Sequence, residues 1–416
     1  MMQNRVLPSW LIRLQFSIME IKQLRSQRPR AWSAILSQEP EMTGIVVTRV
    51  SREKLSPRLT RFILELADHN EPITLIGKET NETEALFYQQ LSGRLPYLAP
   101  RCWFAYVQGE QSWVVLDDVF SARPPQRWTM GDAECVIKGL AGLHVEFWDR
   151  EDVLDQYPWI INPLEGMPPA DRQYLRRKVL EQCTYYAHWD LGITLSDHAI
   201  WSLGQLAPHF LHAAASVAFL QDRGGWPGVF ELHHLDAAAE LLDDPVPMLY
   251  TLRDQPLTLQ HGFPSNNHWL ITLFGSARLL DWQNLTAGPG ITDVIRFVEQ
   301  FDWLYNPQGN LSPRLHPLAS EETLIDSYIL HLAAELGPLC DTRAIRHSIP
   351  AARCFHLLSY WFPHLTDWLL DAQRRGHTLP TLSDEHLIEA GLEPLVALKP
   401  LIAATANRFW AAYKML

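Results

Sequence analysis

Cysteine is scarce in this chain of 416 residues, and no two cysteines form a C-x-x-C pair. Scattered thiols without a partner motif give neither a disulfide framework nor a zinc site, and they are typical of proteins whose cysteines stay reduced in the cytosol. We therefore expect a cytoplasmic protein. The five cysteines are Cys102, Cys135, Cys183, Cys340 and Cys354.

A long hydrophobic run is also missing. No stretch of about 18 apolar residues occurs, so the sequence predicts no membrane-spanning helix. The N-terminal apolar stretches are interrupted by Arg13 and Glu20, which argues against a secretory signal peptide. Met19 and Met42 are alternative starts, and we expect residues 1–43 to be a loosely attached N-terminal extension.

Positive charge is in deficit, with 35 lysines and arginines against 47 acidic residues and a net charge of −12. This balance argues against a nucleic-acid partner, because phosphate binding needs a basic surface. The chain also has no G-x-S-x-G elbow, no metalloprotease helix and no dinucleotide fingerprint, so it gives little support to those enzyme classes. Nothing in the sequence indicates an oligomeric state.

The spacing of apolar residues divides the chain into two parts, one with the pattern of strands and one with the pattern of helices. Between positions 44 and 119, short β-branched runs separated by polar turns predict strands around one helix. We expect strands near 44–50, 61–67, 73–79, 101–108 and 112–119, and a helix over 82–91.

After about position 120 the apolar residues recur at helical spacing. We expect helices near 169–187, 195–221, 235–243 and 321–336. The stretch 259–283 differs, because it reads as strand, turn and strand. The pattern predicts an α+β fold with a small β-rich N-terminal lobe over 44–119 and a larger helical lobe over 120–416 that carries the inserted hairpin.

Phosphoryl transfer from ATP requires a cation beside the phosphates and an oxygen ligand for Mg²⁺, and three residues of this sequence can supply them. Lys78 lies on a predicted strand, and Glu84 on the following helix is positioned to hold its ammonium group, with Glu79 and Glu82 as rival partners. Asp281 follows an apolar strand in RLLDWQ and offers the hard oxygen that Mg²⁺ prefers.

The end of the last N-terminal strand, in SWVVLDDV, lies where a connector to the helical lobe is expected. Backbone groups of Leu116, Asp117 and Val119 would read an adenine ring there. An ordinary edge strand is the alternative interpretation.

Taken together, these stretches resemble the aminoglycoside phosphotransferase and choline/ecdysteroid kinase-like family, which has the protein-kinase-like fold. The resemblance covers roughly 44–370 and rests on IGKE…TEALFYQQL, VVLDDV, GLAGLHVEFWD, QHGFPSNN and LLDWQNLTAGPGITDVIRFVE. It implies that Lys78 and Glu84 form the family's ion pair, that Asp281 holds the metal, and that Asp293 is a structural anchor. It further implies ATP and Mg²⁺ as cofactors and a small-molecule hydroxyl as the acceptor.

In that comparison the catalytic loop matches the His and Gly of the family's H-G-D-x-x-x-x-N pattern at His261 and Gly262 and departs from it after Gly262. Without a gap, Phe263 stands at the position of the catalytic Asp and His268 at that of the metal-binding Asn, and the next strand keeps its phase. With one residue deleted, Asn267 keeps the metal role and the Asp has no counterpart. Both alignments lack the base, so His261, Phe263 and His268 are the candidate catalytic positions, and Asn267 and Asp281 are the candidate metal ligands.

Two hypotheses remain. A positioned base is typically worth about 10²- to 10⁴-fold, whereas phosphoryl transfer rests mainly on positioning and electrostatics, so a slow phosphotransferase is possible. The alternative is a catalytically weakened relative that binds a nucleotide or small ligand as a sensor or scaffold. No glycine-rich loop precedes Lys78, since SREKLSPRLTRF has no glycine.

Overall fold

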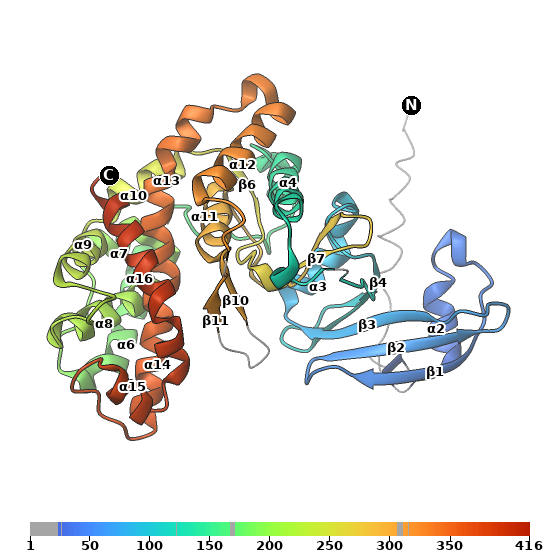
Figure 1. Cartoon of the computed structure of the whole chain (residues 1–416), viewed down its shortest axis with the longest axis horizontal. Helices are drawn as coiled ribbons and strands as arrows, with labels where there is room; N and C mark the ends of the chain where they lie inside the picture. Colours follow the sequence, from blue (N-terminus) through green and yellow to red (C-terminus); the bar gives the residue numbers. More distant parts are fainter. Residues whose placement is uncertain (1–23, 26, 122, 167–170, 306–310, 315) are drawn as a thin grey trace. The chain divides into compact units, whose positions relative to one another are not determined.

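The computed structural model describes residues 24–25, 27–121, 123–166, 171–305, 311–314 and 316–416 (Figure 1). The chain forms two compact units. The N-terminal unit runs to Pro124 and includes His268–Leu285, and the C-terminal unit comprises Pro125–Asn267 and Thr286–Leu416. The predicted α+β class is confirmed, because an antiparallel sheet dominates the first unit and helices dominate the second (Figure 1).

The N-terminal unit is built on a five-stranded antiparallel sheet with the strand order β1-β2-β3-β5-β4. The strands are β1 (Val47–Lys54), β2 (Leu59–Leu66), β3 (Ile73–Thr80), β4 (Cys102–Tyr106) and β5 (Ser112–Asp117). Gly77 in β3 is required by close packing, because a Cβ there would lie 2.6 Å from the Phe62 ring and 2.8 Å from the Trp113 ring.

One face of this sheet is covered by α2 (Pro29–Leu36). Trp32 is fully buried, and its ring centroid lies 4.7 Å from that of Phe62. The expected boundary of a loose extension at residue 43 therefore differs from the structure, since apolar side chains of 29–36 complete the core of the sheet. Residues 1–23 and 26 lie outside the described residues.

The N-terminal unit also contains α3 (Glu82–Gln90) and the hairpin of β7 (Trp269–Ile271) and β8 (Ala277–Leu279). The Leu279 amide donates to the Leu98 carbonyl at 2.9 Å. The sequence placed the hairpin of β7 and β8 in the helical lobe. In the structure it belongs to the N-terminal unit, to which long-range hydrogen bonds such as that from Leu279 to Leu98 connect it.

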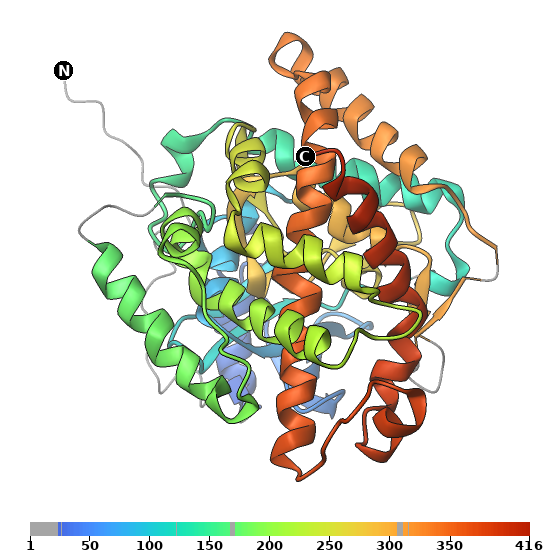
Figure 2. The same ribbon diagram turned by 90° about the vertical axis from the view of Figure 1, so that its left-hand side faces the viewer.

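The C-terminal unit is a set of packed helices, and α13 and α16 lie side by side (Figures 1 and 2). A short antiparallel pair, β6 (Leu257–Gln260) and β9 (Thr286–Pro289), lies among them, and β10 (Trp303–Tyr305) pairs with β11 (Leu311–Pro313). The helices are α4 (Met130–Glu146), α5 (Glu151–Leu154), α6 (Arg172–Cys183), α7 (Asp197–Leu203), α8 (Ala207–Asp222), α9 (Leu232–Asp243), α10 (Val246–Arg253), α11 (Ile291–Gln300), α12 (Glu321–Leu336), α13 (Thr342–His356), α14 (Phe362–Arg374), α15 (Asp384–Glu389) and α16 (Glu393–Tyr413), with a π-helical turn at Leu357–Trp361.

Two predicted helices show how local signals set boundaries. The prediction of α12 is confirmed: the Ser320 side chain accepts from the Thr323 amide at its start, and Gly337 ends it with a φ of 55°. The single helix predicted over 195–221 is wrong. Gly204, with a φ of 56°, ends α7, and Pro208 lies in the first turn of α8. None of the helices in the described part of the chain has the length and apolar character that a membrane span requires.

Candidate functional site

Lys78 lies in β3 and directs its ammonium group at α3. Its Nζ lies 2.9 Å from Glu84 Oε1 and 2.7 Å from Glu84 Oε2. The rival carboxylates are elsewhere: Glu79 pairs with Arg25 at 3.4 Å, and Glu82 is exposed. Of the three alternatives, the structure therefore pairs Lys78 with Glu84.

Glu84 is completely buried, and three donors satisfy its carboxylate. Besides Lys78, the Thr80 hydroxyl donates to Oε2, and the Trp282 amide donates to Oε1 at 3.3 Å. The helix that carries it starts at Asn81, whose side-chain oxygen accepts from the Glu84 amide at 3.0 Å. This N-cap fixes the first turn of α3 and therefore the position of the carboxylate.

Asp281 completes the group around the ammonium. Its Oδ1 lies 2.5 Å from Lys78 Nζ, and Gln283 Nε2 donates to the same oxygen at 2.6 Å. The three residues Lys78, Glu84 and Asp281 form what we call the Lys78 cluster. Burial would raise the pKa of Asp281, but Lys78 and then His268 and Gln283 outweigh it, so the pKa lies below its ordinary value. Asp281 is therefore an ionised carboxylate.

The backbone at Asp281 is unusual, since its φ of 66° and ψ of 59° lie in the left-handed region. Few non-glycine residues adopt this conformation, which is found preferentially where function requires it. The next residue anchors it: Trp282 is fully buried, and its ring stacks on Phe87 with centroids 4.0 Å apart. Asn81 Nδ2 also donates to the Gln283 carbonyl at 3.0 Å.

His268 lies beside the same aspartate, with its Nε2 3.3 Å from Asp281 Oδ2. Strand β7 begins at the next residue, Trp269. Asn267, the ligand of the gapped alignment, belongs to the C-terminal unit. It is exposed, and its side chain makes no hydrogen bond with the described residues.

The predicted adenine-binding segment ends β5. Leu116 is buried in the strand, and Asp117 Oδ1 accepts from Trp103 Nε1 at 2.6 Å. Burial raises the pKa of Asp117, although the bond from Trp103 and the Arg101 charge act in the opposite direction. The Val119 amide donates to the Asp117 carbonyl at 3.0 Å. An adenine ring that used this amide would have to replace that bond.

The start of the predicted catalytic loop is held by Asp293, which belongs to α11. Asp293 Oδ2 accepts from the His261 amide at 2.7 Å, and Oδ1 accepts from the Gly262 amide at 3.0 Å. Burial would raise the pKa of Asp293, but His144, at 3.6 Å, and then His261 and Arg296 lower it below its ordinary value. The geometry fits the anchoring role that the family resemblance implied.

The residue after Gly262 in this loop is Phe263, the position that the ungapped alignment assigns to the family's carboxylate. The Phe263 ring stacks on Tyr360 of the π-helical turn, with centroids 5.2 Å apart and an interplanar angle of 30°. The His261 ring is completely buried, and its Nδ1 accepts from the Phe263 amide at 3.3 Å. That bond fixes the turn after Gly262, whose φ is 82°.

Two residues that hold the candidate site together were not predicted from the sequence. Asn266 binds the end of α11, because its Nδ2 donates to the carbonyls of Gln300, Phe301 and Trp303 at 3.1, 2.9 and 3.2 Å. The adjacent asparagines gave no signal to tell this buried residue from Asn267. Gln283 was missed too, although its place two residues after Asp281 was the available signal.

Within the described residues, no group of three or more His, Cys, Asp and Glu side chains forms a metal site. The side chain of Asp281 is 30% exposed.

No protein-family model matches this chain, and no curated protein matches it. Among solved structures, it is similar to choline kinase from Cryptosporidium parvum Iowa II, with 13% identity, coverage of 87% of this chain and 93% of that chain, and a TM-score of 0.43. An aminoglycoside phosphotransferase from Alicyclobacillus acidocaldarius is 12% identical over 88% of this chain and 91% of its own, with a TM-score of 0.43. Plasmodium vivax ethanolamine kinase is 10% identical over 86% and 83%, with a TM-score of 0.42.

Proposed function

We propose that this protein is an ATP- and Mg²⁺-dependent phosphotransferase that acts on a hydroxyl group of a small molecule. The observation that carries the proposal is the Lys78 cluster in the N-terminal unit. Burying charges does not by itself stabilise a fold, because desolvation offsets their attraction. Groups of charges with perturbed pKa values are typical of functional sites, and Asp281 also carries an uncommon backbone conformation.

The two carboxylates of the Lys78 cluster have different surroundings. Glu84 is completely buried and is held by Thr80 and Trp282, so it keeps the ammonium in place. Asp281 is the more exposed partner. We expect a triphosphate to take the place of Asp281 beside Lys78. The Lys78 ammonium would then neutralise part of the phosphate charge while it stays bound to Glu84.

Loss of the bond between Lys78 and Asp281 leaves Asp281 Oδ1 available for a cation. An ionised aspartate is a suitable Mg²⁺ ligand, and the exposed Asn267 amide is the second candidate. His268 is the less suitable ligand, because Mg²⁺ has little affinity for imidazole. When bound, Mg²⁺ would supply neutralisation of the phosphate charge.

A second function, that of a pseudo-phosphotransferase which binds nucleotide or a small ligand as a sensor or scaffold, is favoured by one observation. Phe263 occupies the catalytic position of the ungapped alignment and stacks on Tyr360. A phenyl ring cannot accept a proton, so any transfer lacks the contribution of about 10²- to 10⁴-fold that a positioned base supplies.

ATP turnover with and without candidate acceptors separates the two functions. Four proteins are compared: the wild type, Asp281→Asn, Phe263→Asp, and a variant with Asp inserted between Gly262 and Phe263. Asp190→Asn is the matched control, because Asp190 has a similar left-handed backbone (φ 54°) and is exposed.

Turnover by the wild type that Asp281→Asn abolishes, with Asp190→Asn unaffected, supports the enzyme. If the wild type binds nucleotide without turnover, and Phe263→Asp or the Asp insertion restores turnover, the pseudo-phosphotransferase is supported. Absence of ATP binding by the wild type would overturn both functions.

A further inference from the structure

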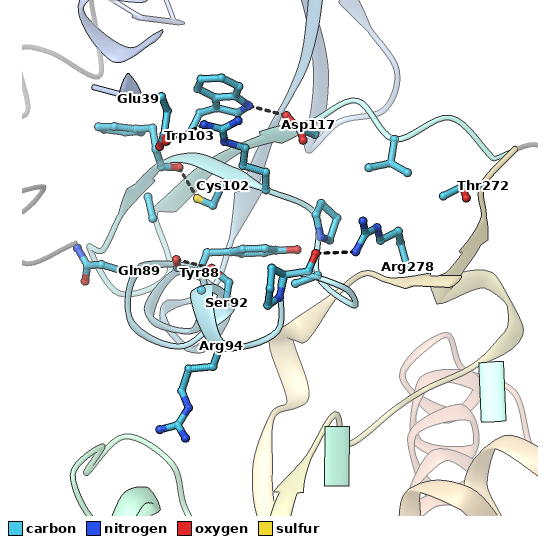
Figure 3. A pocket seen from close by; sticks show the side chains of 18 of the residues that line it. Glu39, Tyr88, Gln89, Ser92, Arg94, Cys102, Trp103, Asp117, Thr272 and Arg278 are labelled. Carbon is cyan, nitrogen blue, oxygen red and sulfur yellow. Dashed lines mark hydrogen bonds and ion pairs between the residues drawn. The ribbon is translucent and has the colours of Figure 1, made fainter. Parts of the chain in front are cut away.

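The N-terminal unit contains a pocket of about 960 Å³ whose lining includes no member of the Lys78 cluster (Figure 3). Its walls come from α3, from the segment 92–101, from β4 and from the turn between β7 and β8. Pockets that bind small molecules measure roughly 300–1,000 Å³, so this one is large enough for a ligand.

Tyr88 of α3 supplies the first indication of what the pocket binds. Its side chain is 5% exposed, and its buried hydroxyl has no hydrogen-bond partner in the part of the chain that the structure describes. Figure 3 shows the ring lying along the pocket, with the hydroxyl directed toward the side where Arg278 lies. Folded proteins rarely leave such a group unpaired, because its lost hydration is not replaced.

Arg278 of β8 supplies a second donor. Its Nη1 donates to the Pro96 carbonyl at 2.7 Å. Its charge also acts on Asp117 of the same pocket, against the burial that raises the pKa of that carboxyl group. Arg101, which also lines the pocket, differs because Glu39 binds it at 2.6 Å. A guanidinium group has five N–H donors, so Arg278 keeps the capacity to bind an anion in a forked geometry.

Two of the three carboxylates that line the pocket are engaged. Asp117 accepts from Trp103 Nε1 at 2.6 Å, and Glu39 is paired with Arg101. The third, Glu41, is 83% exposed and lies 4.0 Å from Arg101. The acceptors of Asp117 and Glu39 are therefore occupied, whereas Tyr88 and Arg278 keep donors for a ligand.

Three of the residues that line the pocket have large, exposed apolar side chains. Phe120, Leu273 and Phe274 are 75%, 78% and 98% exposed. A pocket that combines apolar side chains with a few polar groups is typical of a ligand-binding site.

We propose that this pocket binds a small amphipathic anion, whose carboxylate or phosphate group accepts from the Tyr88 hydroxyl and Arg278 while its apolar body contacts Phe120, Leu273 and Phe274. The pocket contains no member of the Lys78 cluster, but Asp117 and Val119 of the candidate adenine-binding segment are among the residues that line it. The proposed binding does not depend on phosphotransferase activity.

Binding is tested by isothermal titration calorimetry on the full chain. The probes are 3-phenylpropionate and phenyl phosphate, which distinguish a carboxylate from a phosphate, and 3-phenylpropanol, which is a neutral analogue. Tyr88→Phe removes only the hydroxyl, and Arg278→Gln removes the charge. Tyr185→Phe and Arg346→Gln change exposed residues outside the pocket and serve as matched controls.

We expect at least one anionic probe to bind the wild type, and each pocket variant to lose about tenfold in affinity, as for a hydrogen bond to a charged group. The two control variants should bind the probe with the wild-type affinity. The unfolding midpoint of Tyr88→Phe should equal or exceed that of the wild type. The proposal is overturned if neither anion binds at about 10 mM, if Tyr88→Phe binds as well as the wild type, if the alcohol binds equally, or if Mg·ATP displaces the probe. Probe binding by a protein that does not bind ATP would support this site and refute the proposed function.

Discussion

Glu84→Gln is the substitution that probes the Lys78 cluster most closely, because it keeps the shape of the side chain and removes its charge. Glu84 is fully buried and accepts from Lys78 at 2.9 Å, from the Trp282 amide at 3.3 Å and from the Thr80 hydroxyl. A hydrogen bond to a charged group contributes about 1.5–3 kcal/mol. Lys78 keeps its 2.5 Å bond to Asp281, so we expect a loss of about 2 kcal/mol in the free energy of unfolding.

The opposite change, Lys78→Met, is expected to cost more. It leaves the Glu84 carboxylate buried without a cation, and breaking a buried pair from one side costs about 3–5 kcal/mol. The double variant should therefore lose less than the sum of the two single losses. Urea unfolding followed by tryptophan fluorescence measures all three variants.

The matched control is Glu65→Gln in the same sheet, because Glu65 is exposed and pairs with Arg49 at 3.4 Å. An exposed pair of this kind contributes less than about 1 kcal/mol. If Glu84→Gln shifted the unfolding free energy no more than Glu65→Gln does, the Lys78 cluster would not be the tight internal site described above.

Three further changes test the packing and charges around the site. Gly77→Ala should cost about 1–3 kcal/mol in urea unfolding, because its Cβ meets the Phe62 and Trp113 rings; an unchanged midpoint would contradict this close packing. Asp293→Asn should cost about 2–3 kcal/mol by the same assay, because an amide cannot accept from both loop N–H groups as the carboxylate does, and a wild-type value would argue against the anchor. Burial raises the pKa of Glu299 to about 8, so its protonated form favours the fold: the stability it contributes is present below pH 4.5 and is lost as the pH rises through about 8. Unfolding measured from pH 5 to 9 should show this decline in the wild type and not in Glu299→Gln, and equal profiles would refute the assignment.

Local patterns were sufficient for much of the N-terminal unit. A lysine at the end of a strand and a glutamate in the first turn of the next helix lie only six residues apart, so short-range geometry brings Lys78 to Glu84. The ends of α12 were predictable for the same reason, since Ser320 and Gly337 act on the adjacent turn.

Features that depend on distant contacts were not predictable. The hairpin of β7 and β8 joins the N-terminal unit through bonds such as that of Leu279 to Leu98, and no local pattern encodes them. The role of Asn266 at the end of α11 depends equally on a segment more than 30 residues away. Pro208 and Gly204 were a visible local signal that should have divided the helix predicted over 195–221.

The roles of the candidate residues are a separate matter from their positions. Asp281 lies beside Lys78, and His268 lies beside Asp281, but a position does not determine which group binds a metal. That choice depends on the ligand preferences of the cation, which favour oxygen over imidazole for Mg²⁺.

The most direct test of the proposed nucleotide site is an equilibrium titration of ATP, with and without Mg²⁺, against the wild type, Asp281→Asn and the control Asp190→Asn. The account predicts that Mg²⁺ strengthens ATP binding to the wild type and to the control. Asp281→Asn should keep a weaker ATP affinity, supplied by Lys78, and lose most of the Mg²⁺ effect. Failure of the wild type to bind ATP, or an equal Mg²⁺ effect in Asp281→Asn, would contradict the central claim.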